Sequence, residues 1–182
     1  MKVDICNTDK KYNVIYADPP WHYHTWKNGM GTAEKHYPTM KIEEIVAMKD
    51  TIQKISDKNC VLFLWVTFPC LLEGLKTIKE WGFKYKTCGF TWVKRNKVSD
   101  TWFFGLGHWT RANAEICLIA TKGQIKRVSN KVAQVVDTHI EEHSKKPAIV
   151  RERIVELVGD LPRIELFARQ TAEGWDCWGN EV

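Results

Sequence analysis

The sequence has no long apolar run and no low-complexity stretch. Its longest apolar runs, such as Cys60 to Val66, are far too short to cross a bilayer, and the N-terminal sequence MKVDICNTDKK lacks the apolar stretch of a signal peptide. No proline-rich or serine-rich segment interrupts its 182 residues, a length close to that of one ordinary domain. We therefore expect a single domain over residues 1–182, no membrane association and a cytoplasmic location.

The sequence also has no C-x-x-C pair. Because Cys60 and Cys117 fall inside apolar, strand-like runs, buried free thiols are favoured over disulfides or a zinc site. Two histidine pairs could suggest a metal, but no cysteine or carboxylate set completes a site, so no metal is expected. The six cysteines are Cys6, Cys60, Cys70, Cys88, Cys117 and Cys177, and the histidine pairs are His22 with His24 and His139 with His143.

Positive charge is only mildly in excess of negative charge. The formal net charge is +5, which favours a polyanionic partner weakly, because many proteins without nucleic-acid partners are equally basic. A basic stretch suits either a solvated loop or a loop that contacts phosphates, and it comprises Lys122, Lys126, Arg127 and Lys131. Hydrophobic residues make up 44% of the chain and nine tryptophans are present, which is enough for a substantial core.

Apolar, β-branched runs alternate with stretches of helical period, the pattern of strands joined by crossover helices. This pattern predicts an α/β fold. The expected strands are Asn13 to Ala17, Val61 to Val66, Lys86 to Val93, Glu115 to Thr121, Val132 to Val136 and Arg163 to Phe167. The expected helices are Lys41 to Ile55, Pro69 to Trp81 and Pro147 to Gly159, the last with Ser144 to Pro147 as its start and Gly159 followed by Pro162 as its end.

Ligands of open α/β sheets bind where strands end and loops begin. Three such places stand out: Asp18 to Trp21, Lys122 onward and Arg169 onward. Two loops that mix glycines, aromatic residues and cations, Trp26 to Thr32 and Asp100 to Gly107, are interpreted as lids that could order on a substrate.

At the first of these places, the strand YNVIYA leads directly into Asp18-Pro19-Pro20-Trp21. This string suits the methylation of an adenine amino group, whose nitrogen is a poor nucleophile because its lone pair is delocalised into the ring. Asp18 can accept one amino hydrogen, and the carbonyl of Pro19, held by the rigid Pro-Pro backbone, can accept the other. Trp21 can stack on a base taken out of its helix, a contact worth roughly 1–3 kcal/mol.

A structural interpretation of the same string has about equal weight on spacing alone. Asp18 is then a turn former after a buried strand, and Trp21 is a core residue. The string is moderately specific, because Asp-Pro-Pro followed by an aromatic residue marks amino-methyltransferases broadly, without choosing adenine over cytosine or a protein glutamine.

The chain resembles the MT-A70 family of adenine methyltransferases, which is related to the eukaryotic messenger-RNA writer enzyme and has many bacterial and phage members. The resemblance covers nearly the whole chain and rests on the order and spacing of several motifs. These are Asp4-Ile5, DPPW, Tyr37-Pro38-Thr39-Met40, LFLWVT at 62–67, TWVK at 91–94, GHW at 107–109, HSKKP at 143–147, IELFAR at 164–169 and GN at 179–180.

This resemblance implies a Rossmann-like S-adenosylmethionine-dependent methyltransferase fold, with a mixed, mostly parallel sheet in permuted order. The permutation accounts for the lack of a G-x-G-x-x-G fingerprint after any strand, because cofactor binding is then spread over several loops. By position, the implied cofactor contacts are Asp4 and Ile5 with Asn180 and Glu181 for the adenine, Asp18 and Pro20 for the methionine end, Lys122 for the carboxylate and Arg169 for the ribose. Tyr37 and Glu115 match positions that approach the acceptor base.

The chain departs from the eukaryotic enzyme at two places. Thr171 and Ala172 stand where that enzyme has histidine and asparagine, so ribose recognition differs in detail, and Glu181 replaces an amide. HSKKP is interpreted simply as the start of a helix. The chain also lacks an RNA-binding zinc-finger extension, so target choice rests on this domain or on a partner.

The leading hypothesis is therefore an adenine-specific DNA methyltransferase, with RNA as the main alternative. The preference for DNA rests on association, namely the small size, the lack of the extension and the likeness to phage-type members. A non-catalytic nucleic-acid-binding subunit and a methyltransferase acting on a protein or small molecule are alternatives of other classes. Because one small domain must reach both strands of a duplex, a homodimer or a partner subunit is also considered.

Overall fold

The chain folds around one mixed β-sheet. The computed structural model describes residues 1–22, 39–107, 109–142 and 145–182, and seven strands in this part of the chain lie in the order β5-β3-β4-β2-β1-β6-β7. Every neighbouring pair is parallel except the two that involve β4, which runs antiparallel to both β2 and β3. The strands are β1 Tyr12–Ala17, β2 Ser56–Val66, β3 Lys84–Arg95, β4 Ala114–Lys122, β5 Val135–His139, β6 Arg163–Leu166 and β7 Asp176–Trp178. The predicted mostly parallel, Rossmann-like sheet is confirmed.

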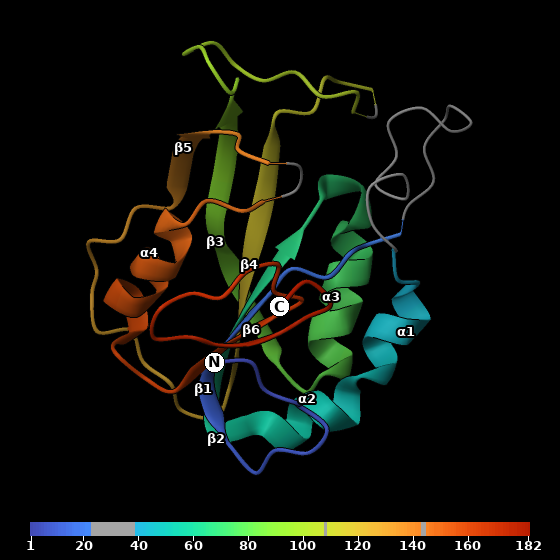
Figure 1. Ribbon diagram of the computed structural model, residues 1–182, viewed down its shortest axis with the longest axis vertical. Helices are drawn as coiled ribbons and strands as arrows, with labels where there is room; N and C mark the ends of the chain where they lie inside the picture. The colour runs from blue at the N-terminus through green and yellow to red at the C-terminus, as the bar shows by residue number, and fades with distance from the viewer. Residues whose placement is uncertain (23–38, 108, 143–144) are drawn as a thin grey trace.

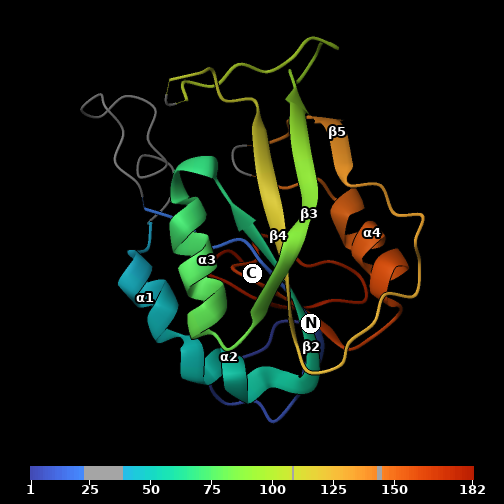
Figure 2. The same ribbon diagram turned by 180° about the vertical axis from the view of Figure 1, so that it is seen from behind.

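Helices cover both faces of this sheet. Three of them, α1 (Ile42–Ala47), α2 (Lys49–Ile55) and α3 (Leu71–Glu80), pack on one face, and α4 (Ile149–Val158) packs on the other (Figures 1 and 2). A short 3-10 helix, η2 (Phe68–Cys70), leads into α3. No helix in the described part of the chain is long and apolar enough to cross a membrane.

Strand β1 shows why two helical layers form. Successive side chains of a strand point to opposite faces, and all of Val14 to Ala17 are apolar or aromatic. Ile15 and Ala17 join the core under α1 to α3, whereas Val14 and Tyr16 join the core under α4. A central strand that is apolar on both faces requires cover on both, and the crossover helices supply it.

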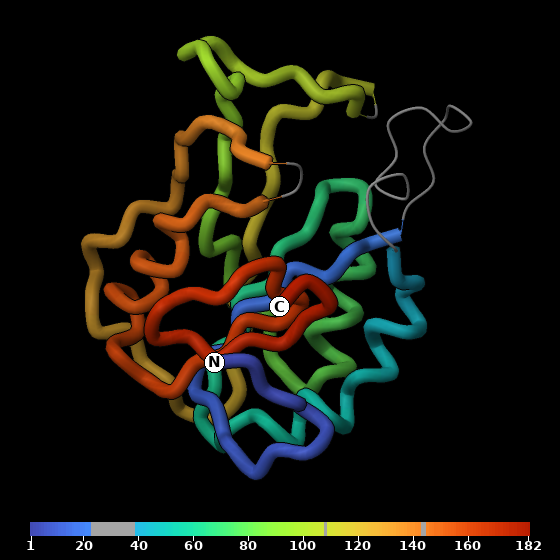
Figure 3. The backbone as a smooth tube through the Cα atoms, viewed as in Figure 1, coloured from blue at the N-terminus to red at the C-terminus, as the bar shows by residue number. Residues whose placement is uncertain are grey.

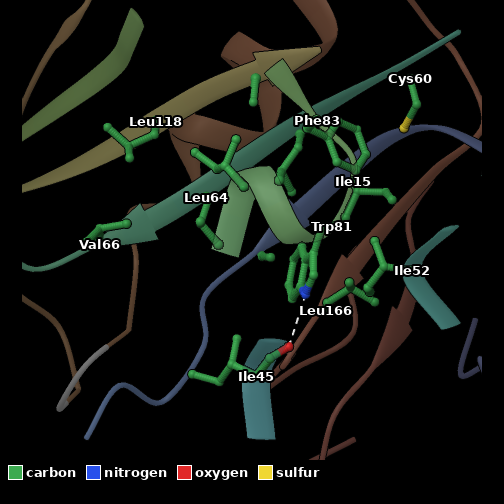
Figure 4. Packing of buried hydrophobic residues seen from close by; sticks show 14 of the residues in the cluster. Ile15, Ile45, Ile52, Cys60, Leu64, Val66, Trp81, Phe83, Leu118 and Leu166 are labelled. Atoms are coloured by element: carbon green, nitrogen blue, oxygen red, sulfur yellow. Dashed lines mark hydrogen bonds between the residues drawn. The ribbon is translucent and has the colours of Figure 1, made fainter. Parts of the chain in front are cut away.

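Trp81 closes the larger core. Its side chain is fully buried at the end of α3, and its indole N–H donates to the carbonyl of Ile45 in α1 at 3.0 Å (Figure 4). Around it pack Ile15 and Leu166 from the sheet and Ile52 from α2. A buried indole needs such an acceptor, and this one fixes α1 against α3.

The smaller core contains a buried ion pair. Arg151 of α4 donates to both carboxylate oxygens of Glu165 in β6, at 2.7 and 2.9 Å. The guanidinium carbon of Arg151 also lies 5.9 Å from the ring centroid of Tyr16. This bidentate pairing lets a charged residue occupy a strand position that is otherwise apolar.

The permuted order brings the two ends of the chain together. The last strands, β6 and β7, lie next to the first strand, β1, and Lys2 forms a parallel bridge with Cys177 of β7. Figure 3 shows the N-terminal and C-terminal segments side by side. The edge of the sheet beside β1 is therefore built from both ends of the sequence.

Most of the predicted elements are present, with several differences in their bounds. The helix expected over Lys41 to Ile55 is divided at Met48 into α1 and α2, and β5 begins at Val135 rather than Val132. Strand β7 was not predicted. It is only three residues long, too short for an alternating pattern to stand out.

Candidate active site

Chain segments from both sides of β1 meet just beyond its carboxyl end. Asp18 follows Ala17 directly, and the parallel strands β2, β6 and β7 end at the same edge. Because β4 is antiparallel, it brings its first residues, including Glu115, to this edge. Strand β3 brings its last residues, including Lys94, and the segment after β5 brings Lys146. The topology thus gathers four charged side chains that are distant in sequence.

These four side chains form a chain of alternating charge. The ammonium nitrogen of Lys146 lies 2.8 Å from Oδ2 of Asp18 and 3.3 Å from Oε2 of Glu115. Lys94 pairs with the other carboxylate oxygen of Glu115. The side chains are 11–23% exposed, so each charge has lost much of its water and depends on its partners.

Two pKa shifts of opposite sign follow from this arrangement. Burial raises the pKa of Asp18, and nearby Glu115 adds to the rise, although Lys146 opposes it. Burial also disfavours the ionised form of Glu115, but Lys146 and Lys94 outweigh it and lower the pKa of Glu115 to about 2. Asp18 is therefore the better proton acceptor of the two carboxylates.

Lys146 is held in its charged form. Burial works against the charge, but Asp18 and Glu115 together raise the pKa of its ammonium group. The same nitrogen lies 5.5 Å from the ring centroid of Trp65, and the ammonium of Lys94 lies 4.7 Å from that of Trp92. Both cations thus rest near aromatic faces in a partly desolvated recess.

The DPPW turn is fixed by main-chain hydrogen bonds. The N–H of Trp21 donates to the carbonyl of Pro19 at 2.8 Å, and the N–H of Met40 donates to the carbonyl of Pro20 at 2.8 Å. Pro19 is buried and Asp18 is partly exposed. The carbonyl of Pro19, expected to accept an amino hydrogen of the base, already accepts one hydrogen bond and has a second lone pair.

Trp21 is too deeply buried to stack on a nucleic-acid base. Its side chain is 6% exposed within the core under α1 to α3, and its indole N–H donates to the carbonyl of Trp65 at 2.8 Å. A face so fully covered offers no platform for a base. Among the described residues, the structure therefore favours the core interpretation of Trp21 over base stacking.

Replacing Trp21 by phenylalanine tests this assignment. The change keeps an aromatic face but leaves the buried carbonyl of Trp65 without its donor, so we expect the free energy of unfolding to fall by about 1–2 kcal/mol. Urea unfolding would measure the loss. Unchanged stability together with weaker nucleic-acid binding would instead restore the stacking role.

The position of Lys122 contradicts the sequence-based expectation. Lys122 is the last residue of β4 and pairs in register with Cys60 of β2, whereas Asp18 follows the residue that pairs with Leu64, further toward the carboxyl end of β2. It therefore lies at the opposite end of the sheet from Asp18. Lys122 was expected at the site because it follows a strand, but β4 runs antiparallel to both of its neighbours, so its carboxyl end and the basic stretch after it lie away from the site.

Arg169, Asn180 and Glu181 lie together at the same edge as Asp18. They follow the parallel strands β6 and β7, and the N–H of Ala168 donates to the carbonyl of Trp178 at 2.9 Å. Arg169 forms an ion pair with Glu181 at 2.8 Å and helps to lower the pKa of Asp18, which offsets part of the rise. The predicted cofactor residues of this segment are thus close to one another and to Asp18.

Asp4 and Ile5 lie beside β7, in the turn that follows the bridge between Lys2 and Cys177. The carboxylate of Asp4 accepts hydrogen bonds from the side chain of Asn7 and the N–H of Cys6, which lower its pKa. The side chain of Ile5 is buried in the core. Tyr37, which was predicted to approach the acceptor base, falls outside the described residues.

Sequence reasoning missed two members of the charged cluster, Lys94 and Lys146. Both stand inside recognised strings, TWVK and HSKKP, but the second was interpreted only as a helix start. A signal was available in the first string, because Lys94 follows Trp92 by two residues on the same face of a strand. For Lys146 no local pattern distinguishes a buried lysine from a surface one.

All six cysteines are free thiols, and Cys6 is the exposed one. The described residues contain no group of three or more histidine, cysteine, aspartate or glutamate side chains that could hold a metal ion. Two of the histidines weighed as metal ligands, His24 and His143, lie outside these residues.

The mixed sheet, with an acidic Asp-Pro-Pro-aromatic turn at the end of the interior strand β1, defines the class of Rossmann-like amino-methyltransferases. Residues 12–181 match the family model described as MT-A70. The chain belongs to the MT-A70 family.

Relatives of known name are similar over nearly the whole chain. The type II methyltransferase M.MunI of Mycoplasma sp is 34% identical, over 95% of this chain and 78% of its own length. A putative N(6)-adenosine-methyltransferase MT-A70-like protein of Medicago truncatula is 30% identical over 94% of this chain, and the human N(6)-adenosine-methyltransferase catalytic subunit METTL3 is 28% identical over 94%. The chain spans only 26% and 28% of those two eukaryotic proteins. The names support adenine methylation as the activity of this family.

Proposed function

We propose that the protein transfers a methyl group from S-adenosylmethionine to the exocyclic amino nitrogen of adenine in DNA. The observation that carries the proposal is the partly buried cluster of Asp18, Lys146, Glu115 and Lys94 at the DPPW turn. It combines a carboxylate of raised pKa with a cation at the edge of the sheet where ligands of such folds bind.

The residues at this edge fit S-adenosylmethionine in charge and in hydrogen-bonding capacity. The ammonium of Lys146 would hold the cofactor carboxylate, and Asp18 would hold the cofactor ammonium. The two opposite charges at the methionine end of the cofactor thus match those of the Asp18–Lys146 ion pair. Arg169 and Glu181 would contact the ribose, with Asp4 and Asn180 nearer the adenine. When bound, the cofactor supplies a methyl group on a positively charged sulfur.

Asp18 has the central role in the transfer. Its hydrogen bond to Lys146 uses Oδ2, and Oδ1 is the oxygen proposed to accept a hydrogen from the adenine amino group. With the carbonyl of Pro19 as second acceptor, the nitrogen lone pair is localised toward the methyl carbon. The N–C bond forms as the S–C bond breaks, its electron pair stays on sulfur, and the surplus proton of the nitrogen passes to Asp18.

DNA is proposed as the substrate because of a relative that is matched over most of its own length. M.MunI is named a type II methyltransferase, a term used for enzymes that modify DNA, and this chain covers 78% of it. The relatives named for adenosine are far longer, and this chain corresponds to about a quarter of each. The net charge of +5 suits either nucleic acid.

Competition between substrates tests this choice. The protein would be incubated with radiolabelled S-adenosylmethionine and equal amounts of adenine-containing DNA and RNA oligonucleotides of matched sequence, each with an adenine-free control, before nucleoside analysis. The proposal expects label in N6-methyldeoxyadenosine. Label in N6-methyladenosine alone would keep the chemistry and replace DNA by RNA, and label in neither would point to a non-catalytic subunit or to another acceptor.

The pH dependence of the reaction should report on Asp18. A carboxyl group of raised pKa is protonated at a higher pH than usual, so we expect the rate to fall on acidification with a midpoint above 3.8, while Glu115 stays ionised down to about 2. Single-turnover rates over an acidic pH series would show this, with circular dichroism to confirm that the protein remains folded. The residual rate of an Asp18→Asn variant should lack this dependence, and an identical pH profile in that variant would contradict the assignment.

A further inference from the structure

Strands β3 and β4 continue past the edge of the sheet as a projecting hairpin (Figures 1 and 2). We call residues 96–107 and 109–113 the hairpin tip. Two main-chain hydrogen bonds cross it: the N–H of Asn96 donates to the carbonyl of Thr101 at 2.9 Å, and the N–H of Gly105 donates to the carbonyl of Ala112 at 2.6 Å. This connection stands out from the core.

The hairpin tip exposes large apolar side chains. Trp102 is 42% exposed, Phe104 56%, Leu106 70%, and Trp109 is fully exposed. Trp109 also has a φ of 63°, a conformation that costs an ordinary residue roughly 1–2 kcal/mol. A cluster of this kind on a projecting element marks a surface that binds another molecule.

Polar contacts support the main chain of the hairpin tip and the ring of Trp102. Arg111 donates to the carbonyls of Gly105 and Phe104 at 2.9 and 3.1 Å. At the base of the hairpin tip, Arg95 forms a bidentate pair with Asp137 of β5, and its guanidinium carbon lies 4.4 Å from the ring centroid of Trp102. The aromatic surface is thus presented on a braced support, which reduces the entropy lost when a ligand binds.

The charge of this region favours a polyanion. Within the hairpin tip, Lys97 and Arg111 stand against one carboxylate, that of Asp100. Lys94 and Arg95 at its base are already paired with Glu115 and Asp137. A second copy of the chain docked through a two-fold axis would bring these cations toward each other. Phosphates between stackable bases would instead satisfy both the cations and the aromatic faces.

The hairpin tip is continuous with the proposed active site. Lys94, which pairs with Glu115, accepts a main-chain hydrogen bond from the N–H of Phe103 at 2.9 Å, and its ammonium lies 6.0 Å from the ring centroid of Phe103. The exposed Phe104 is the next residue. A nucleic-acid strand with its target base at Asp18 would therefore contact the hairpin tip through nucleotides close to that base.

We infer that the hairpin tip binds the nucleic-acid strand that carries the target adenine, with Phe104 and Trp109 stacking on its unpaired bases and Lys97 contacting its phosphates. This inference rests on the proposed function, because it assigns the surface that delivers the substrate. It adds a binding surface outside the charged cluster and the cofactor residues.

Alanine variants of the exposed aromatic residues provide the test. Phe104→Ala and Trp109→Ala should each weaken binding of a fluorescently labelled single-stranded DNA oligonucleotide roughly tenfold, measured by anisotropy. Tyr85→Ala is the matched control, since Tyr85 is a 45% exposed aromatic residue on β3, at the end of the sheet opposite the hairpin tip, and it should leave affinity unchanged. Lys97→Gln should reduce the slope of log affinity against log salt concentration by about 0.7, the value for one phosphate contact on a single strand.

The same variants separate this inference from the proposed function. If the wild-type protein methylates DNA and both aromatic variants bind it with wild-type affinity, the hairpin inference is wrong and the proposed function stands. A change in sedimentation coefficient with unchanged DNA affinity would identify the surface as a contact between copies of the chain and overturn the inference. A wild-type protein that transfers no methyl group to any nucleic acid would overturn both.

Discussion

Replacing Asp18 by alanine is expected to lower the rate of methyl transfer at least about a thousandfold without unfolding the protein. The variant loses the acceptor for the amino group and the acceptor for the surplus proton at once. Lys146 keeps Glu115 as a partner, so its charge stays compensated. Single-turnover transfer at saturating cofactor and DNA measures the effect, and thermal unfolding monitors the fold.

Two further variants sharpen this test. Asp18→Asn keeps the shape and one acceptor oxygen but removes the charge, so its rate should lie between those of wild type and Asp18→Ala. Asp160→Ala removes an exposed carboxylate that pairs with the partly buried Arg163 at the start of β6, and it should leave the rate unchanged. An alanine variant at position 18 that retains most of its activity would show that chemistry does not depend on this carboxylate.

The Lys146→Met variant is expected to lose both stability and cofactor affinity. Methionine keeps much of the aliphatic length, but Asp18 and Glu115 are left as carboxylates without their shared cation. The free energy of unfolding should fall by about 3 kcal/mol at neutral pH, which urea denaturation can measure. Affinity for S-adenosylmethionine should fall at least roughly tenfold by calorimetry, because an ion pair to its carboxylate is lost.

The pH dependence of this loss has a definite sign. Without Lys146, the pKa values of Asp18 and Glu115 in the folded protein rise. A carboxyl group whose pKa is raised by folding destabilises the folded state only at pH values where the group is ionised. The deficit in stability should therefore shrink as the pH falls and the two groups become protonated. A deficit that stays constant or grows on acidification would mean that lost packing, rather than lost charge compensation, explains the effect.

Lys122→Met is the matched control for the cofactor measurement. The resemblance pointed to Lys122 as the partner of the cofactor carboxylate, whereas the structure places it at the far end of the sheet. Its replacement should leave cofactor affinity unchanged. If Lys122→Met weakened binding and Lys146→Met did not, the assignment of the cation would have to be reversed.

The error at Lys122 shows where sequence reasoning stops. An apolar run located β4 almost to the residue, because the sequence of apolar side chains is a local property. Strand direction depends on which strands pair, which is settled by contacts between Cys60 and Lys122 or Trp65 and Cys117, far apart in the chain. A run of residues therefore predicts a strand but not which of its ends faces the site.

Asp18 and Trp21 show the same limit within one motif. Both stand in DPPW, and the string identified the turn and its carboxylate because Asp18 follows a strongly apolar strand. The burial of Trp21 depends on the carbonyl of Trp65 in β2, which no local pattern specifies. Lys146 was missed for the same reason, since its two carboxylate partners come from β4 and from the end of β1.

The central claim is that Asp18 and its turn methylate the amino group of adenine. The most direct measurement is mass spectrometry of nucleosides from the DNA of a bacterial host without adenine methylation of its own, expressing either the wild-type protein or Asp18→Ala. This design requires no knowledge of the recognition sequence. The account predicts N6-methyldeoxyadenosine with the wild-type protein and none with the variant, and equal amounts with both proteins, or methylated cytosine in place of adenine, would contradict it.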